Sequence, residues 1–136
     1  MQPTERLRQG MDGTATTVVT REVTVAHFHP EMPEVYGTPF MIYLMEVAAS
    51  NAIQAEMLDG WVSVGTEVNV KHLAATPVGR SVTATATVTA VDGRLICFDV
   101  EAHAGVTKVG SGTHQRTAID LARFERHLQI QRPTDP

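Results

Sequence analysis

The sequence predicts an α+β domain in which one antiparallel sheet of about five strands wraps around a single long helix. Three observations lead to this prediction: one helical stretch follows Pro39, several consecutive stretches have the residue pattern of strands, and apolar residues suffice for one core. The chain has 136 residues, of which 43% are hydrophobic and 19% are charged, so we expect one domain. Because Cys97 is the only cysteine, a disulfide framework is excluded.

The first predicted strand covers residues 14–28, TATTVVTREVTVAHF, where β-branched side chains are in excess. Pro30 and Pro33 then interrupt it. Before this strand, residues 1–13 carry mixed charges and two glycines, and we expect them to form a flexible arm. Residues 14–130 are expected to form the domain and residues 131–136 a C-terminal tail.

The long helix is predicted to begin at Thr38, with Thr38 as N-cap and Pro39 at the first helical position. Good helix formers follow for about 20 residues, until Asp59 and Gly60 supply a stop signal. Residues 40–49 are apolar almost all round, which is typical of a helix that other elements enclose.

Four strands in succession are predicted after the helix, which gives the order β-α-β-β-β-β. Asp92-Gly93 is a strong hairpin signal between two of them. Gly110 and Gly112 share one face of the last strand, where the missing side chains would let the helix approach closely. The predicted strands cover residues 61–73, 80–91, 94–104 and 108–119, and a short closing helix covers residues 120–130.

Composition also limits the possible partners. The net charge of −4 argues against nucleic acid as a partner, because binding phosphates requires a basic surface. No apolar run approaches the length of a membrane span and the N-terminus has no secretory apolar region, so we expect a cytoplasmic protein without a membrane partner. The six histidines and one cysteine lack metal-site spacing, and we expect neither a metal nor a bound cofactor.

Glu46 is the first candidate for chemistry, because it is the only ionised residue between Pro39 and Gln54. Apolar neighbours on the helix would make its carboxylate a stronger base or nucleophile. The alternative is a glutamate on the polar edge of the helix, an edge that continues through Ser50 and Gln54.

Thr38 and His72 are weaker candidates when each is taken alone. Thr38 is accounted for by capping, although a helix N-terminus also offers N–H groups to a developing oxyanion. His72 ends the strand after the helix, where the alternative is a histidine that is structural or merely exposed.

Three stretches taken together resemble the hotdog-fold acyl-CoA thioesterases, and most closely the branch that includes fluoroacetyl-CoA thioesterase. The match runs from about residue 14 to residue 119. Gly-Thr-Pro leads the helix, and glutamate follows the threonine by eight residues. The stretches are VYGTPFMIYLMEVAASNA, VGTEVNVKHLAATPVGRSVTATATV and DGRLICFDVEAHAGVTKVGSGTHQR.

The resemblance implies a hotdog fold, with Thr38, Glu46 and His72 as catalytic residues. Gly65 matches the glycine that lets the acyl end lie against the backbone. The family also implies a homodimer, or a tetramer built from it, whose sheets join and whose active sites lie near the subunit interface. Residues 29–35 do not match clearly, so fluoroacetyl specificity does not carry over.

The expected function is hydrolysis of a short or modified acyl-CoA thioester to the free acid and CoA, with coenzyme A entering only as part of the substrate. The phosphates of CoA would require a local cluster of basic residues. The alternative is a non-catalytic module on the same fold that binds or senses acyl-CoA. The candidate substrate-binding residues, besides Gly65, are Tyr36, Asn69, Lys71, Arg80, Lys108, His114 and Arg116.

Overall fold

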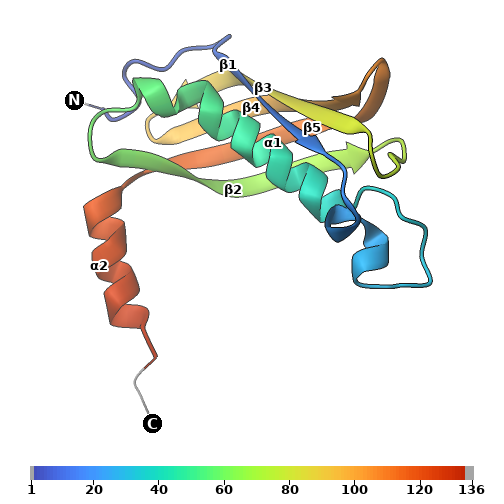
Figure 1. Cartoon of the computed structure of the whole chain (residues 1–136). Helices are drawn as coiled ribbons and strands as arrows, with labels where there is room; N and C mark the ends of the chain where they lie inside the picture. The colour runs from blue at the N-terminus through green and yellow to red at the C-terminus, as the bar shows by residue number, and fades with distance from the viewer. Residues whose placement is uncertain (1, 134–136) are drawn as a thin grey trace.

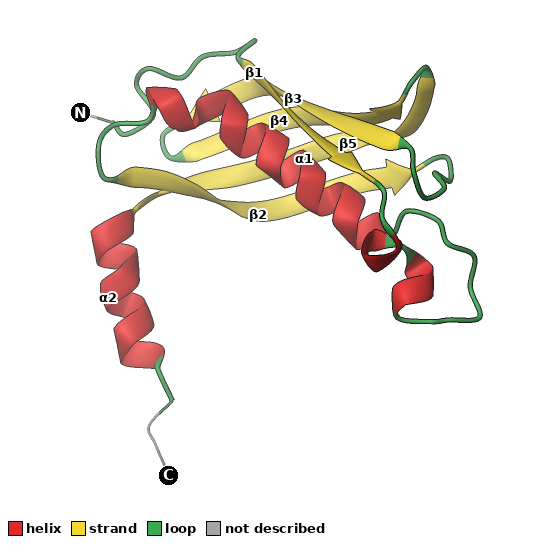
Figure 2. Cartoon of the chain, viewed as in Figure 1, coloured by secondary structure: helices red, strands yellow, loops and turns green. Residues whose placement is uncertain are grey.

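The computed structural model describes residues 2–133, and Figures 1 and 2 show its elements. Five strands form one antiparallel sheet in the order β1-β3-β4-β5-β2, and helix α1 lies across one face of this sheet. The predicted α+β class is therefore confirmed, but within one chain α1 is covered on one face only, and Tyr43 on the other face is 67% exposed. The elements are β1 (Asp12–Val18), α1 (Thr38–Ile53), β2 (Trp61–His72), β3 (Ser81–Asp92), β4 (Leu95–Ala104), β5 (Thr107–Asp120) and α2 (Leu121–Gln131).

The core lies between α1 and the concave face of the sheet. Met41, Met45 and Ile53 of the helix are at most 1% exposed, as are Val88 and Phe98 of the sheet. Burial of each such side chain contributes about 1.5–3 kcal/mol to folding. This packing fixes α1 along the sheet and so positions every side chain of the helix.

Two glycines of β5 allow close approaches of different kinds. A Cβ at Gly110 would overlap the sulfur of Met41 on α1, as predicted. A Cβ at Gly112 would instead overlap Asn69 and Val70 of β2, so the expected approach of the helix there is wrong. At Gly112 it is the neighbouring strand, not the helix, that needs the space.

The first strand is shorter than predicted. β1 ends at Val18, and two short 3₁₀ helices follow at Arg21–Val23 and Val25–His27. The hydroxyl of Thr24, which is fully buried, donates to the carbonyl of Arg21 at 2.6 Å. Such a local bond competes with strand pairing, which explains why a Thr- and Val-rich segment leaves the sheet.

Helix α1 also starts differently from the prediction. Gly37 is the N-cap, so Thr38 is already helical and Pro39 is at the second helical position. The α-helix ends at Ile53, and a 3₁₀ turn, Gln54–Glu56, completes the segment. The hydroxyl of Thr38 is therefore free of a capping role.

The N-terminal segment that was expected to be a flexible arm lies against the fold. Thr4 and Leu7 are buried, and the Thr4 hydroxyl donates to the carbonyl of Gly93 in the β3–β4 turn. The amide of Gly10 donates to the carbonyl of Val88 at 2.9 Å. At the other end, the predicted tail continues beyond position 133, outside the described residues.

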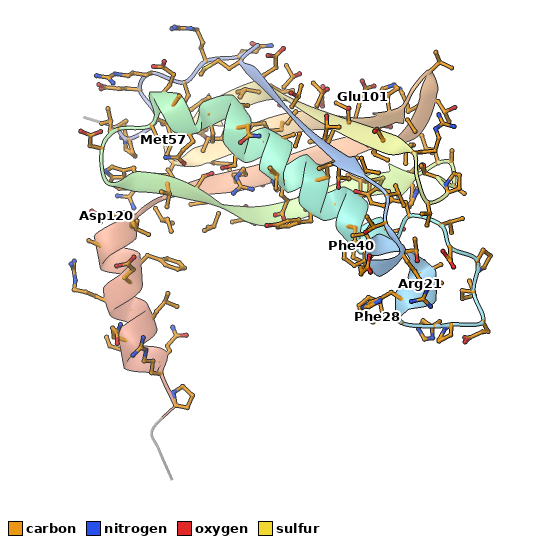
Figure 3. All side chains as sticks on the ribbon, viewed as in Figure 1. Arg21, Phe28, Phe40, Met57, Glu101 and Asp120 are labelled. Atoms are coloured by element: carbon orange, nitrogen blue, oxygen red, sulfur yellow. The ribbon has the colours of Figure 1, made fainter. Side chains whose placement is uncertain are left out.

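Helix α2 leaves the end of β5 and stands clear of the sheet (Figures 1 and 2). Figure 3 labels Asp120 at this junction, where its carboxylate caps the helix by accepting from the amide of Arg123 at 3.1 Å. The surface of α2 includes exposed Leu121, Phe124 and Leu128. Within residues 2–133, no helix has both the length and the apolar character for a membrane crossing.

Candidate functional site

Thr38 and His72 form a direct pair. Thr38 opens helix α1 and His72 ends strand β2, and the Thr38 Oγ1 atom lies 2.8 Å from His72 Nδ1. Gly110, which lies opposite His72 on β5, leaves room for the helix at this point. Thr38 and His72 border a pocket of about 360 Å³. The residues that line it are Val25, Val35, Tyr36, Thr38, His72, Leu73, Ala74 and Ala75.

The second ring nitrogen of His72 is buried and has no hydrogen-bond partner among the described residues. Buried polar atoms are almost always paired, so an orphan beside a pocket marks a group available to a bound molecule. An imidazole held at Nδ1 with Nε2 unpartnered is suited to proton transfer.

Glu46 lies two helical turns after Thr38, in contact with β2. Its side chain is 32% exposed, and its Oε1 atom lies 3.9 Å from Nη1 of Arg116. A Cβ at Gly65 would overlap Glu46 Oε1, so only glycine allows the carboxylate to lie against this strand. The carboxylate borders a second pocket of about 320 Å³, which Ser50 and Ser63 also line.

Arg116 anchors this second pocket from β5. Its guanidinium donates from Nε to Ser63 Oγ at 2.8 Å and from Nη2 to the Ser63 carbonyl at 3.0 Å. Burial lowers the pKa of Arg116 and the Glu46 carboxylate opposes that shift, but an arginine remains charged in either case. The pocket therefore holds a fixed positive charge beside the Glu46 carboxylate.

His114, two positions before Arg116, completes the cluster and is 1% exposed. Its Nδ1 donates to the carbonyl of Glu67 at 2.8 Å, so its Nε2 is the atom that accepts from Arg116 Nη1 at 3.2 Å. Burial lowers the pKa of His114, and the nearby Arg116 charge acts in the same direction; the Glu67 carbonyl and the Glu46 carboxylate oppose them. His114 is thus a neutral, structural imidazole.

This lowered pKa predicts a loss of stability in acid. The unfolded chain binds a proton at His114 near the ordinary histidine pKa of about 6.5, whereas the folded chain binds it only at lower pH. The free energy of unfolding should therefore fall as the pH drops below about 6.5. Thermal melts of His114→Gln between pH 5 and pH 8 should show a shallower pH dependence than the wild type.

The matched control is His127→Gln, which makes the same chemical change at an exposed position of α2. Equal slopes for the wild type and His114→Gln would contradict the neutral state of His114.

The remaining predicted binding residues are scattered. Tyr36 is buried, which raises its pKa to about 12, and its hydroxyl donates to the Phe40 carbonyl at 3.1 Å. Asn69 and Lys71 are exposed on β2. The structure therefore does not bring these three together with Glu46.

Two other predicted cations have partners outside both pockets. Arg80 donates from Nη2 to the carbonyl of Ala104 at 3.1 Å, and Lys108 pairs with Glu101 at 2.9 Å. His114 and Arg116, in contrast, are buried beside Glu46 and are not at a solvated phosphate-binding surface.

Ser63 was missed in the sequence, although it holds Arg116 through two hydrogen bonds. The sequence contained a signal for Ser63: alternate residues of a strand point to the same face, so Ser63 shares a face with Gly65, which was already a candidate.

The pocket beside Thr38 and His72 and the pocket beside Glu46 share no lining residue. Within one chain, the Thr38–His72 pair and the Glu46 carboxylate therefore line two separate pockets.

Comparison with known proteins identifies the family. The family model of the fluoroacetyl-CoA-specific thioesterases matches residues 19–122. The chain belongs to this family. Fluoroacetyl-CoA thioesterase of Streptantibioticus cattleyicolor is 41% identical over 133 residues, covering 93% of this chain and 96% of the relative. The resemblance and the thioesterase class predicted from the sequence are thereby confirmed.

Solved structures similar to this chain include a member of the fluoroacetyl-CoA-specific thioesterase family. A phenylalanine-to-alanine mutant of the fluoroacetyl-CoA-specific thioesterase, in complex with fluoroacetate and CoA, is 43% identical with a TM-score of 0.79, covering 87% of this chain and 99% of that one. A hot-dog-like protein from Thermanaerovibrio acidaminovorans has a TM-score of 0.86 at 23% identity, covering 99% and 100% of the two chains. The predicted hotdog fold is therefore confirmed.

Proposed function

We propose that the protein hydrolyses a short or modified acyl-CoA thioester to the free acid and CoA. The observation that carries this proposal is the Thr38–His72 hydrogen bond, which leaves a second, buried ring nitrogen unpartnered in a member of a thioesterase family. The nearby pocket supplies space for a substrate, and the imidazole supplies a proton carrier.

We further propose that each active site combines two subunits. β2 is an edge strand of the sheet, and residues 65–69 at its centre are exposed. An uncovered edge is a template for pairing with another strand. Antiparallel pairing of two copies about a twofold axis through this stretch would bring Gly65 of one copy within a few residues of the partner's His72.

Such pairing would join the two separate pockets. The Glu46 carboxylate, with its glycine and arginine neighbours, would then face the Thr38–His72 pair of the other subunit. The separation of the two groups within one chain supports this arrangement, since the proposed chemistry requires both at one thioester.

The proposed reaction assigns one role to each group. Donors near Thr38 and Gly65 polarise the thioester carbonyl, and Glu46 either attacks the carbonyl carbon or takes a proton from the attacking water. The carbon–sulfur bond then breaks, and His72 assists proton transfer to the departing CoA thiolate. Where Glu46 attacks directly, water releases the acid from the resulting anhydride and regenerates the carboxylate.

A panel of acyl-CoA thioesters tests the proposal, with the released thiol trapped by a chromogenic reagent. We expect saturable thiol release for short acyl groups, with fluoroacetyl-CoA among them, and a fall as the chain lengthens. Saturable binding of acyl-CoA without thiol release for any chain length would contradict hydrolysis and favour the non-catalytic module.

A further inference from the structure

We propose that a third pocket, where α2 leaves the sheet, binds the phosphorylated adenosine end of the CoA substrate; this rests on the proposed function. The pocket has a volume of about 310 Å³ and lies between Trp61 of β2, Arg94 in the β3–β4 turn, and one face of α2. Nothing in the hydrolytic chemistry above uses these residues.

The side chains of this pocket match a nucleotide that carries phosphates. Trp61 and Phe124 supply aromatic faces, and base–aromatic stacking contributes to nucleotide binding whatever the base. The Arg94 guanidinium lies 4.8 Å from the centroid of the Trp61 ring. Arg123 and His127 add two more nitrogen-bearing side chains. Arginine is well suited to phosphate, because its planar fork donates two parallel hydrogen bonds.

The charge of the pocket is available to a ligand. Among residues 2–133, the ion pairs involve Arg21, His29, Lys108 and Arg116, and none involves the cations of this pocket. Asp120 is the one acidic residue in the lining, and its carboxylate accepts from the backbone at the start of α2. A chain with net charge −4 therefore has a local basic site here.

The position of the pocket fits a substrate whose thioester lies at Glu46. Alternate residues of a strand share a face, so Trp61 lies on the same side of β2 as Ser63 and Gly65. The four positions from Gly65 to Trp61 span about 13 Å of strand. In the 3₁₀ turn directly after α1, Gln54 donates to the Trp61 carbonyl at 3.2 Å. The pantetheine arm of CoA can cover this span, with Ser50 and Ser63 beside it.

Trp61 gives a direct test, because it is the only tryptophan in the chain. Titration with adenosine 3′,5′-bisphosphate should quench its fluorescence saturably, and added salt should weaken the effect. The double variant Arg94→Ala, Arg123→Ala should raise the dissociation constant about tenfold or more, since hydrogen bonds to charged groups are the strong ones. Both arginines are exposed, so the fold should not depend on them.

Kinetics separate this subsite from the hydrolytic site. In the double variant, KM for acyl-CoA should rise about tenfold or more while kcat is unchanged, and hydrolysis of acyl thioesters of N-acetylcysteamine, which lack the nucleotide, should not change. The matched control is Arg132→Ala, which removes a guanidinium outside the pocket.

Unquenched Trp61 fluorescence, or an unchanged KM in the double variant, would overturn the subsite while acyl-CoA hydrolysis continues. Absence of hydrolysis for both kinds of thioester would instead overturn the proposed function. The two failures are therefore distinguishable.

Discussion

Glu46→Gln should lower the rate of acyl-CoA hydrolysis by about 10²–10⁴-fold, the contribution typical of a positioned base. The amide fills the same space against Gly65 but can neither attack the thioester nor accept a proton from water. Because the Glu46 side chain is 32% exposed and Arg116 keeps both bonds to Ser63, we expect the melting temperature to stay within a few degrees. Thiol release and thermal melts on the same preparation measure both quantities.

The control for this variant is Glu56→Gln, which makes the same chemical change at an exposed position after α1. It should retain wild-type turnover. If Glu46→Gln also retained wild-type turnover, Glu46 would have no part in the mechanism. A large fall in melting temperature would instead identify the carboxylate as a structural partner of Arg116.

A mixed assembly of Thr38→Ala and Glu46→Gln subunits should be far more active than either variant alone. If each site takes Thr38 from one subunit and Glu46 from the other, a heterodimer contains one site with both changes and one with neither. Heterodimers should then reach about half of the wild-type activity, since a twofold dimer has two equivalent sites. Co-expression with two different affinity tags and sequential purification isolates them.

Each homodimer, purified in the same way with both tags, serves as the control and should stay at its low level. Heterodimers that are no more active than the homodimers would place Thr38 and Glu46 of the same chain in one site. A monomer in solution would remove the shared site altogether.

The sequence predicted the hairpin strands closely and the segment after β1 poorly. Strand β3, with alternating alanine, valine and threonine, and β4 agree with the structure to within one residue, because one face is buried and the other is not. Residues 19–28 have the same β-branched composition but form 3₁₀ turns around the buried Thr24. Composition alone does not show which hydroxyl bonds to its own backbone.

The candidate site was predictable in part. The resemblance singled out Thr38 and His72, but their contact depends on how the end of β2 meets the start of α1, which no local pattern encodes. The sequence predicted that His114 and Arg116 belong to a basic cluster for the CoA phosphates, because polar side chains usually face water. In the fold they share the buried face with Ala118, where Ser63 and the Glu67 carbonyl satisfy them.

The two glycines of β5 have a consequence for how this enzyme can change. They admit Met41 and the backbone of β2, and so they bring the end of that strand over the first turn of α1. Any substitution there would push β2 outward and separate the imidazole from its threonine. The packing of β2 and the proposed catalytic pair therefore depend on the same two glycines, and we expect variation in substrate range to arise at other residues.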